Sequence, residues 1–267
     1  MTNGAGADGA RNAVVITGAA SGIGRASAIR LANAGWAVSI LDINAEAAGR
    51  LATELTQAGL PALAFGCDVT SKDAMRHAVA ETEHRFGTVN AAVACAADQD
   101  TVGTVLETDE DAWRRAVDIT LNGTYMLARA VLPHLIATRG AFVAVSSVAG
   151  IRPARDLAVY NAAKAGVVAL VRSMALDHGP AGVRSNALCP GETITPAHDR
   201  SLGQMTEDQR RALLAAHPLG RFATADEMAA AVAHLVGDEA SFTNGHVYVA
   251  DGGLTAGSFS LSFGAQG

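Results

Sequence analysis

A short glycine-rich turn between an apolar run and a helix-like run is the feature that most limits how this chain can fold. Residues 13–16 read as a buried strand, and residues 25–31 read as the start of a helix. Gly18, Gly22 and Gly24 lie between them, where a backbone without side chains can turn tightly and approach a ligand. The free amide groups and the positive end of the helix dipole at such a turn favour a pyrophosphate. The segment therefore predicts a strand, a turn and a helix that together bind a dinucleotide.

A carboxylate follows the next apolar run at a distance that suits this prediction. Residues 36–41 are β-like and end at Asp42, eighteen residues past the last glycine of the turn. A carboxylate there accepts hydrogen bonds from an adenosine ribose and repels a 2′-phosphate. Neither Ile43 nor Asn44 is basic, and Ser21 stands in the turn where a base that reads the phosphate is expected. These residues favour NAD over NADP. The alternative is that Asp42 is only a solvated residue at the end of a strand, but that role would not require its distance from the glycines.

Tyr160 and Lys164 are four residues apart, and Ser147 lies thirteen residues before the tyrosine. If a helix begins near residue 158, this separation places the phenol and the ammonium on one helix face. A cation held close to a phenol lowers its pKa from about 10, which predicts that Tyr160 acts as an acid and base near neutral pH. A lone pair at this spacing is more often an ordinary helix, but here the pair accompanies the glycine turn.

These motifs, in this order and spacing, resemble the short-chain dehydrogenase/reductase family from about residue 12 to about residue 256. The resemblance implies an α/β fold, a single Rossmann-like domain with a doubly wound parallel sheet of about seven strands flanked by helices. It assigns catalysis to Ser147, Tyr160 and Lys164. The cofactor residues that it implies are Gly18, Ser21, Gly22, Ile23, Gly24, Asp42, Asp68, Val69, Tyr160, Lys164, Pro190, Gly191, Thr193 and Thr195.

The remaining pattern of the chain agrees with this organisation. Apolar runs at residues 62–66, 89–95, 141–146, 183–188 and 246–250 alternate with helix-like segments, as expected for parallel strands buried on both faces. We predict flexible tails at residues 1–11 and 257–267, one domain at 12–256, and a substrate lid at about 192–215. The start of the chain has no apolar stretch, so it reads as a loose tail and not as a signal peptide.

Composition and charge limit the kinds of partner that the protein can bind. The chain is 49% hydrophobic with a net charge of −6, which argues against binding to nucleic acid or to an anionic membrane. Three widely separated cysteines fit reduced thiols in the cytoplasm. The histidines lack metal-ligand spacing, and we expect no catalytic metal. Few polar residues follow Lys164 in its helix, so we expect a homo-oligomer, and the resemblance implies a dimer or tetramer.

The expected function is NAD-dependent interconversion of a secondary alcohol and a ketone by hydride transfer. Tyr160 would exchange the proton, Ser147 would hold the reacting oxygen, and Lys164 would support the tyrosine and, by resemblance, bind the nicotinamide ribose. Two alternatives remain open: an NAD-binding sensor or assembly subunit that has lost turnover, and an NADP-linked carbonyl reductase.

Two departures from the family pattern bear on these alternatives. Residues 94–97 replace a run of two asparagines, an alanine and a glycine, and Thr120 stands where the family has a catalytic asparagine. Thr120 can substitute if only its backbone carbonyl is needed, but not if the asparagine side chain is.

The substrate has a weaker signature. Arg152, Arg155 or Arg200 could grip an anion, but a solvated lid of mixed charge is the simpler interpretation.

Overall fold

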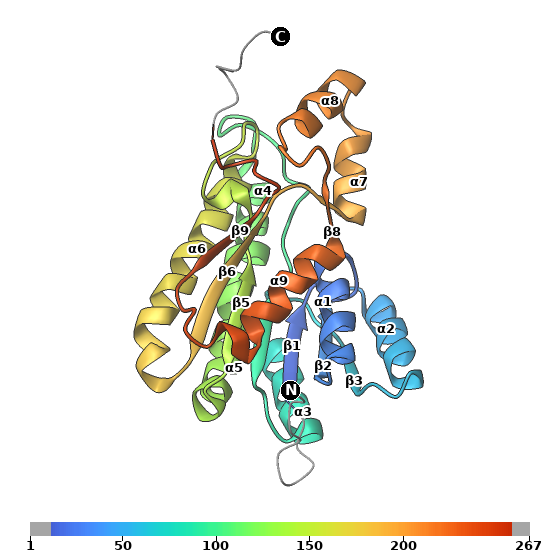
Figure 1. The fold of residues 1–267 in the computed structure, drawn as a ribbon, viewed down its shortest axis with the longest axis vertical. Coiled ribbons are helices and arrows are strands. Elements are labelled where there is room, and N and C mark those ends of the chain that lie inside the picture. The colour runs from blue at the N-terminus through green and yellow to red at the C-terminus, as the bar shows by residue number, and fades with distance from the viewer. Residues whose placement is uncertain (1–11, 258–267) are drawn as a thin grey trace, which may run out of the picture.

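The computed structural model describes residues 12–257, in which seven parallel strands form one sheet (Figure 1). The strands are β1 (Ala13–Thr17), β2 (Ala37–Asp42), β3 (Ala62–Gly66), β4 (Ala91–Ala94), β5 (Ala141–Val145), β6 (Arg184–Pro190) and β9 (Val247–Ala250). Their order across the sheet is β3-β2-β1-β4-β5-β6-β9, so the direction of winding reverses between β1 and β4. The predicted doubly wound parallel sheet is confirmed. Such a reversal opens a crevice at the carboxyl ends of the strands.

Helices cover both faces of this sheet (Figure 1). One layer contains α1 (Gly22–Asn33), α2 (Ala45–Gln57) and α9 (Ala225–Val236), and the other contains α3 (Lys72–Phe86), α4 (Glu110–Val117), α5 (Gly123–Thr138) and α6 (Ala158–His178). Alternate strand residues serve the two layers, as the pleat requires. Val14 and Ile16 of β1 pack toward α1, α2 and α9, whereas Val15 packs toward the opposite layer. The apolar strands are buried on both faces for this reason.

The predicted lid consists of two short helices beyond the carboxyl end of the sheet, α7 (Pro196–Gly203) and α8 (Glu207–Ala215). The short parallel pair β7 (Thr193–Ile194) and β8 (Ala223–Thr224) joins the two ends of this segment. Thr206 and Thr224 form capping boxes with the residue three places on, as that spacing predicts. The predicted tails lie outside the described residues, except for Gly257, and no described helix is long and apolar enough to cross a membrane.

Glycine in the turn after β1 is required by the close approach of the turn to itself and to β4. A Cβ atom added at Gly24 would lie 2.1 Å from the carbonyl oxygen of Gly18. Gly18 has a φ of +62°, and a Cβ atom there would lie 2.8 Å from the backbone nitrogen of Ala96. Neither contact is possible for a larger residue, so these glycines set how closely α1 begins beside β1 and β4.

We expect Gly24→Ala to lower the free energy of unfolding by about 1–3 kcal/mol or more, because the methyl group must displace backbone and not a flexible side chain. Gly49→Ala in α2 is the matched control. Its Cβ atom would meet nothing within 4 Å. We therefore expect that substitution to stabilise the protein by about 0.5–1 kcal/mol through helix propensity. Urea unfolding measures both, and equal effects in the two variants would contradict the steric argument.

Candidate active site

The predicted site residues meet in one cleft at the carboxyl ends of the strands, with a volume of about 1400 Å³. This volume exceeds the roughly 300–1,000 Å³ of a typical small-molecule site, and it leaves room for a dinucleotide beside a small substrate. Every predicted catalytic and cofactor residue lines the cleft except Gly24. Gly24 instead lies against the backbone of Gly18, so its role is to support the turn.

The dinucleotide end of the cleft has features that fit the predicted ligand. The Asp42 carboxylate accepts hydrogen bonds from the amide groups of Ala20 and Asn44, each at 2.9 Å, so it is fixed beside the glycine turn. Ser21 precedes the first turn of α1 and its side chain makes no capping hydrogen bond there. Close backbone approach at the glycines and the first-turn amide groups of α1 are the elements that hold a pyrophosphate. The chain's own residues therefore fit a dinucleotide.

The segment predicted as a lid begins beside this turn. Thr195 caps α7, its Oγ1 atom accepting a hydrogen bond from the amide of His198 at 3.2 Å. A Cβ atom at Gly22 would lie 3.2 Å from the Cγ2 atom of the same threonine. Thr193, two residues earlier, donates its hydroxyl to the carbonyl of Gly191 at 3.0 Å. The segment that the sequence assigned to the cofactor thus also connects the cofactor turn to the lid.

Ser147 and Tyr160 come together beside β5. Ser147 follows the end of β5 by two residues, and its Oγ atom accepts a hydrogen bond from the amide of Ala149 at 3.1 Å. The same hydroxyl is close enough to the Tyr160 phenol to lower its pKa, against the larger effect of burial. Tyr160 lies in the first turn of α6, which begins at Ala158 as predicted. The predicted hydroxyl and phenol therefore both line the cleft.

Lys164 is buried beneath the phenol. Its Nζ atom donates to the carbonyl of Val145 at 2.8 Å and lies 5.6 Å from the centre of the Tyr160 ring. Burial lowers the pKa of Lys164 to about 8. Burial also raises the pKa of Tyr160 to about 12, opposed by the Ser147 contact and reinforced by the charge of Glu192. The pKa of Tyr160 therefore lies above its usual value and not below it as expected, because burial is the largest influence on this phenol.

The altered run at residues 94–97 is linked to β1 through the hydroxyl of Thr17. Thr17 accepts a hydrogen bond from the amide of Cys95 at 3.2 Å, which links the ends of β1 and β4. Burial raises the pKa of the Cys95 thiol to about 11. This thiol therefore stays protonated near neutral pH and is a poor nucleophile.

Thr120 lies on a π-helical turn (Asp118–Asn122) between α4 and α5, and it is fully buried. Its Oγ1 atom accepts a hydrogen bond from the amide of Asp98 at 3.0 Å, and its carbonyl accepts one from the Thr124 hydroxyl at 2.7 Å. Both polar groups of the residue at the family's asparagine position thus have partners within the chain. Thr120 anchors the loop after β4.

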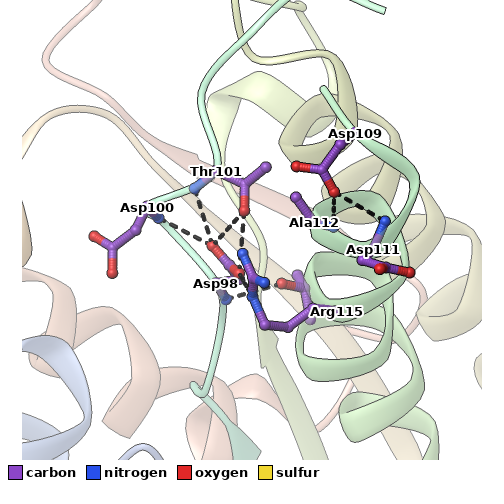
Figure 2. Close-up of polar contacts among 8 residues, drawn as sticks. Asp98, Asp100, Thr101, Asp109, Asp111, Ala112 and Arg115 are labelled. Atoms are coloured by element: carbon purple, nitrogen blue, oxygen red, sulfur yellow. Dashed lines mark hydrogen bonds and ion pairs between the residues drawn. The ribbon is translucent and has the colours of Figure 1, made fainter. Parts of the chain in front are cut away.

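Asp98 organises that loop, which lines the cleft. Figure 2 shows its carboxylate facing the loop that follows it, with hydrogen bonds from the amides of Asp100 and Thr101 at 3.0 and 3.1 Å. The Nε atom of Arg115 in α4 lies 3.6 Å from the other carboxylate oxygen, and Asp109 caps the same helix nearby. The sequence analysis missed this cluster. An aspartate side chain often hydrogen-bonds the backbone two residues later, and this tendency is the signal that could have indicated the turn at Asp98.

The arginines proposed as anion ligands have other partners. Arg152 donates to the carbonyl of Leu254 at 2.8 Å, and Arg200 lies 3.4 Å from Asp100 and donates to the carbonyl of Pro196. Arg155 does not line the cleft. Among residues 12–257, no group of three or more histidine, cysteine or acidic side chains is arranged to hold a metal ion.

We expect Thr120→Val, which keeps the shape but removes the hydroxyl, to lower the free energy of unfolding by about 1 kcal/mol or more, because the Asp98 amide loses its acceptor. Thr56→Val on the exposed side of α2 removes a hydroxyl that bonds only within its helix, and should change stability by less than about 0.5 kcal/mol. Urea unfolding compares the two. Unchanged stability of Thr120→Val would refute the anchoring role.

Comparison with known proteins agrees with this arrangement. A family model described as enoyl-(acyl carrier protein) reductase matches residues 18–255. The chain is 39% identical to a cis-4-hydroxycyclohexanecarboxylate dehydrogenase of Sinomonas cyclohexanicum, across 92% of this chain and 98% of that protein. It is 38% identical to a meso-2,3-butanediol dehydrogenase of Serratia marcescens, across 91% and 94% of the two chains. The crystal structure of levodione reductase superposes with a TM-score of 0.88 at 32% identity, covering 92% of this chain and 98% of that one. With its glycine turn, its parallel sheet and its Ser147, Tyr160 and Lys164 side chains, the chain belongs to the short-chain dehydrogenase/reductase family of oxidoreductases.

Proposed function

We propose that the protein is an NAD-dependent dehydrogenase that interconverts a secondary alcohol and a ketone, with Tyr160 as the acid and base. The observation that carries this proposal is the convergence of Ser147, Tyr160 and Lys164 on the cleft that the glycine turn also lines. The names of relatives support the same reaction class, because dehydrogenases of hydroxylated rings and of a butanediol are among them.

In this proposal each side chain has a separate task. Ser147 positions the substrate oxygen by a hydrogen bond, and the Tyr160 phenol exchanges a proton with that oxygen. Lys164 keeps a cation beneath the phenol and thereby stabilises negative charge as the proton leaves. A nicotinamide dinucleotide, when bound, supplies the hydride acceptor or donor. The raised pKa of Tyr160 favours the phenol as proton donor, which suits ketone reduction at neutral pH.

Asp42 supports NAD as the cofactor. Its carboxylate is fixed at the end of β2, where a 2′-phosphate would meet negative charge. The next side chain, Ile43, is 78% exposed and supplies no cation. Ser21 in the glycine turn is also uncharged at neutral pH. An NADP-linked enzyme would need a positive charge among these three positions.

The exposed side of α6 supports assembly into a homo-oligomer. Its exposed residues include Ala162, Ala165, Ala169 and Leu176, with Arg172 and Ser173 exposed between the last two, and Leu176 is 79% exposed. Exposed apolar side chains on a helix gain by being covered, and a second copy of the chain is the partner we propose. Three unpaired cysteines fit the reducing cytoplasm as the compartment.

The proposed reaction is tested with NAD and a panel of secondary alcohols, in parallel with Tyr160→Phe. We expect wild-type turnover to fall by at least about a hundredfold in the variant, because general acid–base catalysis contributes about 10²–10⁴-fold. NAD affinity, measured by calorimetry, should change little. Full activity in Tyr160→Phe would remove the phenol from the mechanism.

The pH dependence of the wild type provides a second test of the same mechanism. With the pKa of Tyr160 raised to about 12, the phenolate fraction increases with pH throughout the neutral range. Alcohol oxidation needs the phenolate, so its kcat/KM should rise from pH 6 toward pH 8, where Lys164 begins to lose its charge. Ketone reduction needs the phenol and should be nearly flat over this range. Parallel profiles in the two directions would argue for another acid and base.

Cofactor choice is tested by combining Asp42→Ala with Ile43→Arg. We expect the ratio of kcat/KM for NADP to that for NAD to rise at least about tenfold, because a repulsive charge is replaced by an attractive one. Asp42 also holds the turn through Ala20, so both cofactors will bind less well, but that loss cancels in the ratio. An unchanged ratio would contradict the role given to Asp42.

A further inference from the structure

A carboxylate and a buried imidazole face the cleft from the lid side. Glu192 follows Gly191 at the end of β6, and His198 lies in the first turn of α7. Glu192 Oε2 is 3.4 Å from Nε2 of His198, and both residues line the cleft. The negative charge of Glu192 reaches Tyr160, since it raises the pKa of that phenol. Glu192, His198 and Tyr160 all line the same cleft.

His198 is held firmly but its ring nitrogens are not satisfied. The side chain is 6% exposed, and its ring packs edge-on against Phe222 with the centres 4.9 Å apart. Neither ring nitrogen has a hydrogen bond of good geometry, although Glu192 lies at ion-pair distance. Both nitrogens are themselves buried, so the Glu192 side chain, which is 36% exposed, is the member of the pair that a ligand in the cleft can reach.

The other charges at this end of the cleft already have partners. Arg115 lies beside Asp98, Arg200 beside Asp100, and Arg152 donates to a backbone carbonyl. Each of the three arginines that line the cleft among the described residues is thus held by a contact within the chain. Apolar side chains such as Val148, Leu157 and Leu213 supply much of the remaining lining. This lining suits a substrate with an uncharged hydrocarbon framework.

We propose that Glu192, held beside His198, binds a second hydroxyl group of the substrate, so that the enzyme prefers uncharged aliphatic diols to simple alcohols and to hydroxy acids. This inference rests on the proposed dehydrogenase function and specifies its substrate class. A hydroxyl can donate a hydrogen bond to the Glu192 carboxylate, which the neighbouring imidazole holds at the cleft.

The two charged alternatives fit less well. A carboxylate on the substrate would be repelled by the negative charge of Glu192. An ammonium group would have to give up its hydration beside the apolar side chains that line the cleft. A preference for diols also separates this chain from its relative that is named for a hydroxycyclohexanecarboxylate.

The test compares alcohols that share one ring: cyclohexanol, the isomeric cyclohexanediols, and 4-hydroxycyclohexanecarboxylate. We expect kcat/KM for the best diol to exceed that for cyclohexanol by about tenfold to a hundredfold, and the carboxylate to be the poorest substrate. Glu192→Gln should reduce the diol preference by about tenfold and improve the carboxylate relative to cyclohexanol. Glu207→Gln, an exposed carboxylate in the first turn of α8 that does not line the cleft, should leave all ratios unchanged.

Calorimetry on Tyr160→Phe with NADH separates this inference from the reaction itself. This variant keeps the cleft, so the best diol should bind more tightly than cyclohexanol, and adding Glu192→Gln should remove the difference. If no alcohol is turned over but this binding difference is present, the hydroxyl site stands and the dehydrogenase assignment fails. If alcohols are turned over but diol and cyclohexanol are equivalent in wild type and in Glu192→Gln, the hydroxyl site is refuted.

Discussion

The active site depends on a buried ammonium that must have an acceptor. Lys164 donates to the carbonyl of Val145 at the end of β5, and the hydroxyl of Ser146 donates back to the Lys164 carbonyl at 2.9 Å. A Cβ atom at Gly150 would lie 2.8 Å from the backbone of Lys164, so the helix cannot move away without losing close contact. These contacts fix both the depth and the rotation of α6 on the sheet. Tyr160, one turn earlier on the helix, is brought to Ser147 by the same contacts.

Local patterns in the sequence were sufficient for the framework. The glycine turn, Asp42 at a strand end and the helical spacing of Tyr160 and Lys164 each depend on residues within one element or its neighbour, so backbone geometry places them without knowledge of the whole fold. The pKa values could not be predicted this way. They depend on burial, which only the packed molecule determines, and burial reversed the expected direction for Tyr160. Neither Asp98 with Thr120 nor Glu192 with His198 has a periodic spacing, because one member of each pair lies in an irregular loop.

Asp42 has both a structural role and the role that we assign to it in cofactor choice. Its carboxylate holds the turn through Ala20 and also presents the negative charge that we assign to cofactor choice. The glycine turn also contacts the predicted lid, because Thr195 lies against Gly22 and caps α7. Glu192 and His198 lie on either side of Thr195 in the chain. A few short contacts therefore connect the glycine turn, through Thr195, to the segment that carries Glu192 and His198.

The π-helical turn at Asp118–Asn122 has a consequence for how α4 and α5 are related. A wider turn holds more residues than an α-helical one, so it acts as an inserted residue that resets the phase of the helix after it. In a regular helix each residue advances the side chains by about 100°. Without the wider turn, the face of α5 that carries Leu127, Val131 and Leu135 would be rotated away from the sheet. The one extra residue in the π-helical turn thus allows Thr120 to be buried while α5 keeps its apolar face against the core.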